Sequence, residues 1–250
     1  MSFDSKYEVF IADCEKSKSL SYRLRYKAYC LESRFENPDQ FKLKMEFDEN
    51  DERSVHFVVR SRKTREWVGS VRLIIGSFCD IPSRKFVQAP KTHLGNEAAK
   101  EHFASLEEFT KVLEISRLSV LERFRKPGAG AEDRLEGITI MIGLLRAGYE
   151  YSNKQGYKHC FFTVAPALAR ILRRMHFHFC QVGSIVDYHG RRIPHYAYLP
   201  DFSRGLVNHS PALHNMFHRK DTYSSFKGAA SMVVNDGRRS DIDENLPCAV

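Results

Sequence analysis

The chain has 250 residues, of which 42% are hydrophobic and 28% charged, and its formal net charge is +8 at neutral pH. This length suits one elaborated domain or a domain with a tail, and the composition excludes a mostly disordered chain. No apolar run approaches the ~18 uncharged residues of a membrane span, and the N-terminus lacks a basic cap followed by an apolar stretch. We therefore expect a soluble, cytoplasmic protein with no transmembrane segment.

The first half of the chain is predicted to contain a helix and a hairpin. Four apolar residues recur on one helical face, namely Leu20, Leu24, Ala28 and Leu31. This spacing predicts an amphipathic helix, and two β-rich segments joined by a short charged turn predict the hairpin. The predicted elements are a helix at 18–33, a polar acidic loop at 34–53, strands at 55–60 and 67–75, and an irregular connection at 76–110.

The second half adds a strand–helix–strand unit and a further helix with two strands. The predicted elements are a central strand at 112–121, a Gly/Pro connection at 125–132, a buried helix at 135–151, a strand at 158–164, a helix at 167–175 after Pro166, and strands at 181–187 and 193–199 with a tight turn at His189-Gly190. Only one stretch requires a parallel crossover. The order therefore predicts a mixed α/β or α+β fold around one sheet rather than a doubly wound dinucleotide fold.

The C-terminal part differs in composition from the rest. Residues 160–220 contain eight Lys/Arg against two Asp/Glu, and seven of the eleven histidines. A basic face of this kind suits an anionic partner, either nucleic acid or an acidic protein or cofactor. Beyond Asp221 the sequence is rich in Ser, Gly and Asp, which predicts a poorly ordered tail. We divide the chain into a domain at 1–205 and an extension at 206–250 that is at least partly disordered.

Metal and thiol chemistry are not predicted. The six cysteines are scattered, with no Cys-x-x-Cys pair, so neither a zinc site nor a redox dithiol is indicated. Reduced thiols are typical of a cytoplasmic protein. The histidines lack a carboxylate-rich partner nearby, so we interpret them as surface or core residues and expect no metal.

The acidic run from Glu46 to Glu52 is the first candidate for chemistry. Its simplest interpretation is a solvated loop. The sharper alternative is that Glu46, Asp48 and Asp51 attract a substrate ammonium group or hold nearby arginines in place.

Glu114-Ile-Ser-Arg117 in the central strand is the second candidate. Because side chains alternate across a strand, Glu114 and Ser116 are expected on one face and Ile115 and Arg117 on the other. A buried glutamate is costly unless it is paired, so one interpretation is a structural ion pair with an arginine (Arg25 or Arg72). The alternative is a general base, because an amine with a pKa near ~8 arrives mostly protonated and must lose a proton before it attacks.

The third candidate is the string that runs from Arg125 through Gly128 to Gly130, between a strand and a helix. Backbone N–H groups in such a turn, together with a helix N-terminus, can form a cradle for a pyrophosphate. A flexible connection is the alternative interpretation.

Four short motifs occur in a defined order along the chain: Arg25-x-x-x-Tyr29, Glu46-Phe-Asp48-x-x-Asp51, Gly69-Ser-Val-Arg72-Leu and Glu114-Ile-Ser-Arg117. This set resembles the autoinducer (acyl-homoserine-lactone) synthase superfamily and its relatives, the long-chain N-acyl amino acid synthases, over roughly residues 15–200. Length and the His/Pro-containing C-terminal half look most like the branch described as PEP-CTERM/exosortase system-associated acyltransferases. The resemblance implies an N-acetyltransferase-like (GNAT, or acyl-CoA N-acyltransferase) fold, an α+β arrangement with a central mixed sheet flanked by helices.

The resemblance also implies an activity, the transfer of a long-chain fatty acyl group to an amine. The donor would be acyl-carrier protein or, less favoured, coenzyme A, with no permanently bound cofactor. Glu114 corresponds to the favoured base, and a charged network would shape the site through Arg25, Asp48, Asp51, Arg72 and Arg117. The strand that contains Glu114 would diverge from its parallel neighbour and admit the phosphopantetheine arm, where backbone N–H groups polarise the thioester carbonyl. The donor-binding residues would then be Ser116, Leu118, Arg125, Gly128 and Gly130.

The same resemblance suggests where partners bind. The helix at 135–151, with Phe161 and Phe162, would line an acyl tunnel or form ordinary core packing. Acyl-carrier proteins are strongly acidic, so three arginines on one short helix, Arg170, Arg173 and Arg174, are either docking residues or a solvated helix face with favourable charge near its C-terminus.

Three alternatives to the leading function remain open, one of them a non-catalytic member that keeps the fold and binds an acyl ligand. Lactone-forming synthases usually carry a tryptophan shortly after the first-helix motif, whereas the only tryptophan here is Trp67. This departure favours an amino acid or another small amine as acceptor over acyl-homoserine-lactone synthesis. The third alternative is a basic nucleic-acid-binding protein, suggested by the pI of about 9.2, although the interleaved aromatic and basic residues of single-strand binders are absent. We therefore expect no nucleic-acid partner.

Overall fold

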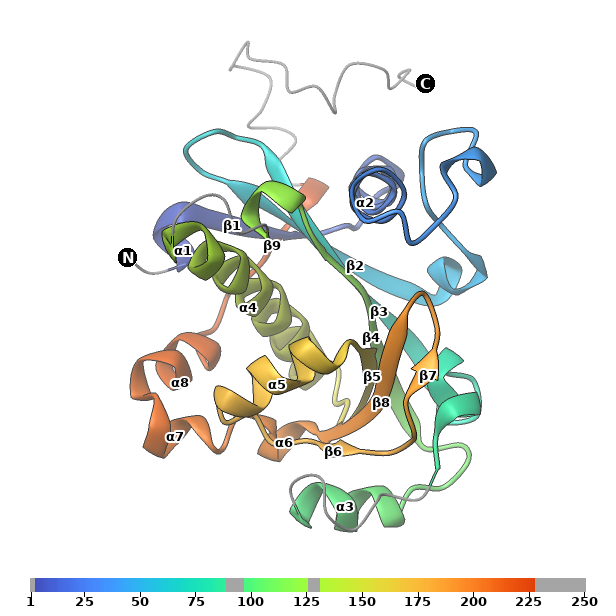
Figure 1. Ribbon diagram of the computed structural model, residues 1–250. Helices are drawn as coiled ribbons and strands as arrows, with labels where there is room; N and C mark the ends of the chain where they lie inside the picture. Colours follow the sequence, from blue (N-terminus) through green and yellow to red (C-terminus); the bar gives the residue numbers. More distant parts are fainter. Residues whose placement is uncertain (1–2, 89–96, 126–130, 228–250) are drawn as a thin grey trace.

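The computed structural model describes residues 3–88, 97–125 and 131–227, and its central feature is one mixed sheet (Figure 1). The strands are β1 Tyr7–Ile11, β2 Ser54–Ser61, β3 Trp67–Ser77, β4 Lys111–Val120, β5 His159–Val164, β6 Cys180–Gln181, β7 Val186–Asp187, β8 Arg191–Tyr198 and β9 Ser224–Ser225. Their order is β6-β8-β5-β4-β3-β2-β1-β9, with β7 paired to β8. Within the described residues the parallel pairs are β4–β5 and β1–β9. The predicted crossover from strand to buried helix to strand is confirmed as β4–α4–β5, whereas the parallel pairing of β1 with β9 was not predicted.

Helices cover both faces of this sheet (Figure 1). The α-helices are α1 Phe3–Lys6, α2 Glu15–Arg25, α3 Glu97–Ala104, α4 Ala131–Lys154, α5 Pro166–Arg174, α6 Leu199–Phe202, α7 Leu206–His209 and α8 Pro211–Phe217. Helix α4 packs across β1 to β4 and α5 packs against β8, whereas α2 packs on the opposite face against β2 and β3. Among the described helices, none has both the length and the apolar character needed to cross a membrane.

The first predicted helix is present, but its last turns are not α-helical. Helix α2 continues directly into a π-helix at Tyr26–Glu32. Leu20, Leu24 and Ala28 are buried as predicted, whereas Leu31 is 55% exposed. Because a π-helix has more residues per turn than an α-helix, residues after position 26 rotate away from the expected face. The prediction that Leu31 belongs to the buried face was wrong for this reason.

Strand β4 is present as predicted, but a bulge interrupts its alternation. Arg72 pairs with Ser116 while Ser70 pairs with Ser119, so β4 has one extra residue here. Arg117 has a positive φ of 50°, a left-handed conformation that is uncommon outside glycine. The expected pairing of Ile115 and Arg117 on one face was therefore wrong: the bulge turns Arg117 toward the carboxylates that also bind Arg72.

The parallel pair β4–β5 separates part of the way along its length. The ladder pairs Val112 through Ile115 of β4 with His159 through Phe162 of β5. Beyond this point β4 continues to Val120 and β5 to Val164 without further pairing between these described strands. The V-shaped opening that the family resemblance implies is therefore present.

Several short elements were missing from the sequence-based prediction. Strand β1 and helix α3 were not expected, and the predicted strand at 181–187 consists of two separate pieces, β6 and β7. The tight turn at His189-Gly190 is present, with φ values of 53° and 88°. Residues 206–227 form α7, α8 and β9, and both Leu206 and Phe217 are buried in the main core. The domain boundary after residue 205 stays a prediction, and 228–250 lie outside the described residues.

Candidate active site

An ion-pair network lies beside the bulge in β4. It joins three arginines to three carboxylates from separate segments: Arg25 at the end of α2, Glu46, Asp48 and Asp51 in the acidic loop, Arg72 on β3, and Arg117 on β4. Arg25 donates through Nε to Glu46 at 2.5 Å and through Nη1 to Asp51 at 2.6 Å. The side chain of Arg25 is completely buried, and Glu46 is 1% exposed.

The other two arginines close the network from the sheet. Arg72 Nη1 donates to Asp48 at 2.7 Å and to Asp51 at 2.9 Å. Arg117 donates through Nε to Glu46 at 3.0 Å and through Nη2 to Asp48 at 3.4 Å. The acidic run is thus not a solvated loop, because its carboxylates hold the three arginines in place.

The network keeps its members charged despite their burial. Burial alone would raise the pKa of Asp48, but the hydrogen bond and charge of Arg72 outweigh it and hold that pKa well below its usual range. Arg25 outweighs burial in the same way at Asp51 and lowers its pKa. His56, which lies 3.5 Å from Asp51, behaves differently. Burial and the charge of Arg25 lower its pKa to about 3, so its ring is neutral at neutral pH.

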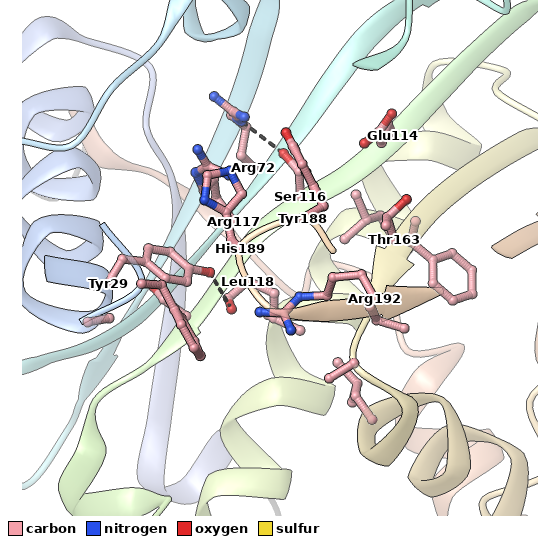
Figure 2. A pocket seen from close by; sticks show the side chains of 18 of the residues that line it. Tyr29, Arg72, Glu114, Ser116, Arg117, Leu118, Thr163, Tyr188, His189 and Arg192 are labelled. Atoms are coloured by element: carbon pink, nitrogen blue, oxygen red, sulfur yellow. Dashed lines mark hydrogen bonds between the residues drawn. The ribbon is translucent and has the colours of Figure 1, made fainter. Parts of the chain in front are cut away.

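Glu114 stands apart from this network (Figure 2). Its Oε2 accepts a hydrogen bond from the backbone N–H of Ser83 at 2.9 Å, and the residue is 4% exposed. No ion pair joins it to another described residue, so the anticipated pair with Arg25 or Arg72 is not formed. Burial raises the pKa of Glu114, although the Ser83 hydrogen bond and the charge of Arg72 oppose the shift. A buried carboxylate with a raised pKa is suited to take a proton near neutral pH.

A cavity of about 240 Å³ opens where β4 and β5 separate. Its polar end contains Glu114, Arg72 and Arg117. Its apolar end is lined by Leu145, Phe162, Val164, Leu168, Leu172 and Phe202. A second cavity of about 20 Å³, reaching Gly148 and Tyr149, shares several of these walls.

One predicted lining residue of the tunnel is absent from the cavity wall. Phe162 lines the cavity, whereas Phe161 is stacked on Phe78 with ring centroids 5.1 Å apart and belongs to a different hydrophobic cluster. Successive residues of β5 point to opposite faces, so only one of the two can face the opening.

The predicted donor-binding residues are spread along the same opening. Ser116 Oγ accepts from Arg72 Nε at 2.9 Å, and the carbonyl of Leu118 accepts from the hydroxyl of Tyr29 at 2.9 Å. Arg125 lines the cavity mouth and pairs with Glu32 at 3.0 Å. Gly128 and Gly130 lie outside the described residues. Within the described part of the chain, no group of His, Cys, Asp and Glu is arranged to hold a metal ion.

The three predicted docking arginines lie exposed on α5. Arg173 is partly engaged, because its Nη2 lies 3.4 Å from His195 Nε2 and its guanidinium lies 5.3 Å from the ring centroid of Phe179. Within the described part of the chain, neither Arg170 nor Arg174 forms an ion pair with a carboxylate. Their role in docking stays a prediction.

The sequence did not assign several residues that line the cavity. They are Glu36 in the loop after the π-helix, and Tyr188, His189 and Arg192 in the β7–β8 hairpin. His189 Nδ1 lies 2.9 Å from a carboxylate oxygen of Glu36 and so joins the hairpin to this loop. The His189-Gly190 turn was a visible signal for a hairpin, but no local pattern indicated that it folds over β4.

Residues 24–131 match the family model described as acetyltransferase (GNAT) domain. Among solved structures, the chain is similar to BjaI, a CoA-dependent acyl-homoserine lactone synthase, with a TM-score of 0.56, 16% identity, and 94% of this chain and 96% of that chain covered. It is also similar to FeeM, an N-acyl amino acid synthase from uncultured soil microbes, with a TM-score of 0.52, 13% identity, and coverages of 80% and 94%. A third similar structure is that of the acyl-homoserine-lactone (AHL) synthase LasI, with a TM-score of 0.51 and 14% identity. The match covers 80% of this chain and 94% of LasI. No curated protein matches the sequence.

The fold is therefore GNAT-like, with a central mixed sheet flanked by helices, and residues 24–131 match an acetyltransferase domain of this fold.

Proposed function

We propose that the protein transfers a long-chain fatty acyl group from a phosphopantetheine thioester to the amine of a small acceptor such as an amino acid. The observation that carries this proposal is the cavity at the β4–β5 opening, which has an apolar end next to Glu114, a buried carboxylate that forms no ion pair with any described residue. An acyl chain needs the first feature and amine deprotonation needs the second.

The donor arm would lie in the opening between the strands. The edge of β4 beyond Ile115 has no β5 residue opposite it in the described ladder, so an extended pantetheine arm would pair with this edge, apart from the Leu118 carbonyl that accepts from Tyr29. In this proposal backbone N–H groups at Ser116 and Leu118 polarise the thioester carbonyl, and preorganised donors of this kind stabilise the developing oxyanion. Arg125, Gly128 and Gly130 would hold the phosphate end of the arm, and the acyl chain would extend toward Leu145 and Phe202.

Glu114 would serve as the general base. The acceptor ammonium group loses one proton to the Glu114 carboxylate, and the free amine forms a bond to the thioester carbonyl carbon, which gives a tetrahedral oxyanion. This oxyanion collapses, the carbon–sulfur bond breaks, and the departing thiolate takes the second proton that the nitrogen loses as it becomes an amide, while the proton on Glu114 passes to solvent. The products are one amide and one free thiol, so no further reactant is needed. The arginines and carboxylates of the charged network are already paired with one another. In this proposal the network therefore does not bind the substrate through free charges but holds the acceptor side of the opening in a fixed shape.

Synthesis of an acyl-homoserine lactone is the second candidate function. The similarity to BjaI covers nearly the whole of both chains, and that protein's described activity favours this candidate. Both candidates place the acyl chain in the same cavity, and they differ in the acceptor and in ring closure. Acyl-carrier protein as donor, a cytoplasmic location and association with an exosortase system remain parts of the proposal that the resemblance alone supports.

Mass spectrometry of lipid extracts tests the proposal. A bacterial host expresses the wild type and, separately, Glu114→Gln, and the folding of both proteins is checked by circular dichroism. New long-chain N-acyl amines with the wild type, lost in a folded variant, are the expected result. Acyl lactones instead would establish the second candidate. If neither product forms, purified protein with loaded acyl-carrier protein, with acyl-CoA and with a panel of amines is the deciding assay, and no transfer there would overturn both.

A further inference from the structure

The cations that line the cavity are not equivalent. Arg72 and Arg117 are paired within the network, and Arg125 is paired with Glu32. Arg192 also lines the cavity, but within the described residues no carboxylate oxygen lies within 4 Å of its guanidinium. Among the described cavity residues, Arg192 is therefore the arginine without a carboxylate at ion-pair distance, although the charge of Asp187 favours its charged form from further away.

Arg192 is nevertheless held in position. Its guanidinium lies 5.3 Å from the ring centroid of Phe35, and its Nη1 donates to the carbonyl of Arg191 at 3.1 Å. Gly190 lies against it as well: a Cβ at this position would be 3.3 Å from Arg192 Nη1. From β8 the side chain extends toward Leu118 and Tyr29 across the opening (Figure 2).

The partial burial of the Arg192 charge is energetically unfavourable, and this points to a bound anionic ligand. Arg192 is half-buried, and burial lowers its pKa, although an arginine in a protein stays charged. A partly desolvated charge without a counter-ion is unfavourable, and a planar guanidinium is the side chain best suited to bind a carboxylate through two parallel hydrogen bonds.

We propose that Arg192 binds the carboxylate of the acceptor, so that the acceptor class is amines that also carry a carboxylate, of which amino acids are the simplest. This inference rests on the proposed function. The competing anion is the donor phosphate, which the proposed function assigns, among the described residues, to Arg125. Since Arg125 and Arg192 are separate groups on separate elements, the donor and acceptor can be tested independently.

The test compares acceptor pairs that differ only in the carboxylate. L-Tyrosine is compared with tyramine and L-leucine with 3-methylbutylamine, using palmitoyl-acyl-carrier protein and palmitoyl-CoA as donors. The variants are Arg192→Met, which keeps a long side chain but removes the charge, and Arg192→Lys, which keeps the charge but removes the planar guanidinium that donates two parallel hydrogen bonds. Arg191→Met is the matched control, because Arg191 is exposed and does not line the cavity.

The expected result is a change confined to the carboxylate-bearing acceptors. Arg192→Met should raise KM for the amino acids by about 10- to 100-fold, leave the donor KM and the amine reactions unchanged, and differ from Arg191→Met, which should match the wild type. Arg192→Lys should give an intermediate value. A raised donor KM with equal losses for both members of each pair would assign Arg192 to the donor phosphate and overturn the inference. Equal use of amine and amino acid by the wild type would overturn it too.

Failure of the proposed function gives a different pattern. If the wild type transfers to no acceptor from either donor, the proposed function is wrong, and calorimetric binding of tyrosine and tyramine then decides the role of Arg192. Binding of tyrosine alone, lost in Arg192→Met, would support the anion site without the transfer reaction. Equal binding of the two compounds, or none, would overturn it.

Discussion

The polar end and the apolar end of the cavity are stabilised in opposite ways. At the polar end, each charge of the network is buried against a partner, so the loss of one member leaves others unpaired. At the apolar end, leucine and phenylalanine side chains make non-directional contacts, and volume decides the outcome. Substitutions at the polar end should therefore report on chemistry and stability, and those at the apolar end on the size of the substrate.

The largest effect is expected at Glu114, the polar group that lies outside the network. Glu114→Gln should lower kcat by about 10²- to 10⁴-fold, the usual contribution of a general base. The melting temperature should stay the same or rise, because the substitution removes a buried charge that has no ionic partner. Steady-state kinetics and thermal denaturation measure the two quantities. A clear fall in melting temperature with activity retained would show that Glu114 is structural.

The pH dependence of kcat sharpens the same test. A base works only when it is deprotonated, so the rate should fall as the pH drops through the pKa of Glu114. Since burial raises this pKa, the acidic limb should lie above the ordinary glutamate value of about 4.3. The limb should disappear in Glu114→Gln, which leaves only the ionisation of the acceptor amine.

Arg25 should show the opposite combination, a large loss of stability. Arg25→Met leaves Glu46 and Asp51 buried without their nearest cation, and breaking a buried pair in this way typically costs about 3–5 kcal/mol. Urea denaturation at neutral pH measures the change. Arg123→Met is the matched control, because Arg123 pairs with Glu66 on the surface, where such pairs contribute about 0–1 kcal/mol. Similar losses in both variants would contradict the distinction between buried network and surface pair.

At the apolar end, a larger side chain in place of Leu145 should shorten the cavity. It lines both cavities, so Leu145→Trp should exclude long acyl chains while short ones still enter. We expect a loss of about 10- to 100-fold in kcat/KM with a sixteen-carbon donor, and little change with a four-carbon donor. Leu145→Met is the control, since volume-conserving exchanges cost little. If chain-length preference is the same in all three proteins, the acyl chain does not occupy this space.

Two buried histidines, one near each end of the cavity, should make the stability of the protein depend on pH. His56 lies beside the network, and His195 is stacked on Phe162 at the apolar end. Burial, with nearby arginine charges (Arg25 and Arg72 at His56, Arg173 at His195), lowers both pKa values to about 3. Between pH 6.5 and 3 the unfolded chain binds more protons than the folded one, so stability falls as the pH falls.

Between pH 6.5 and pH 5, protonation of each histidine in the unfolded chain should lower the free energy of unfolding by up to about 2 kcal/mol. Urea denaturation at these two pH values measures the cost, and His56→Gln and His195→Gln should each remove its own share. A wild-type slope retained in both variants would assign the pH dependence to other groups.

The sequence predicted the network better than it predicted the cavity. The arginines and carboxylates were found because buried charges require partners, and their motifs occur in a recognisable order. The bulge at Arg117 was not predictable, because it depends on register against β3 rather than on any local signal. The same holds for Glu36, in the loop after the π-helix, and for Arg192, near the start of β8, because tertiary packing rather than a local pattern brings both to the cavity. Strand β1 was missed because five residues in a polar setting give too short a pattern.

The smallest effect is expected outside both ends, on α5. Arg170 and Arg174 are exposed, so reversing their charge should act through encounter with an acidic carrier protein rather than through stability. Arg170→Glu/Arg174→Glu should raise KM for acyl-acyl-carrier protein by about 3- to 10-fold at low salt, and less at high salt, because salt screens exposed charges. KM for acyl-CoA should change less, since coenzyme A has no comparable protein surface. Arg62→Glu/Lys63→Glu on the β2–β3 hairpin provides a charge-matched control. An equal rise in KM for acyl-acyl-carrier protein in this control would show that net charge, and not docking on α5, causes the effect.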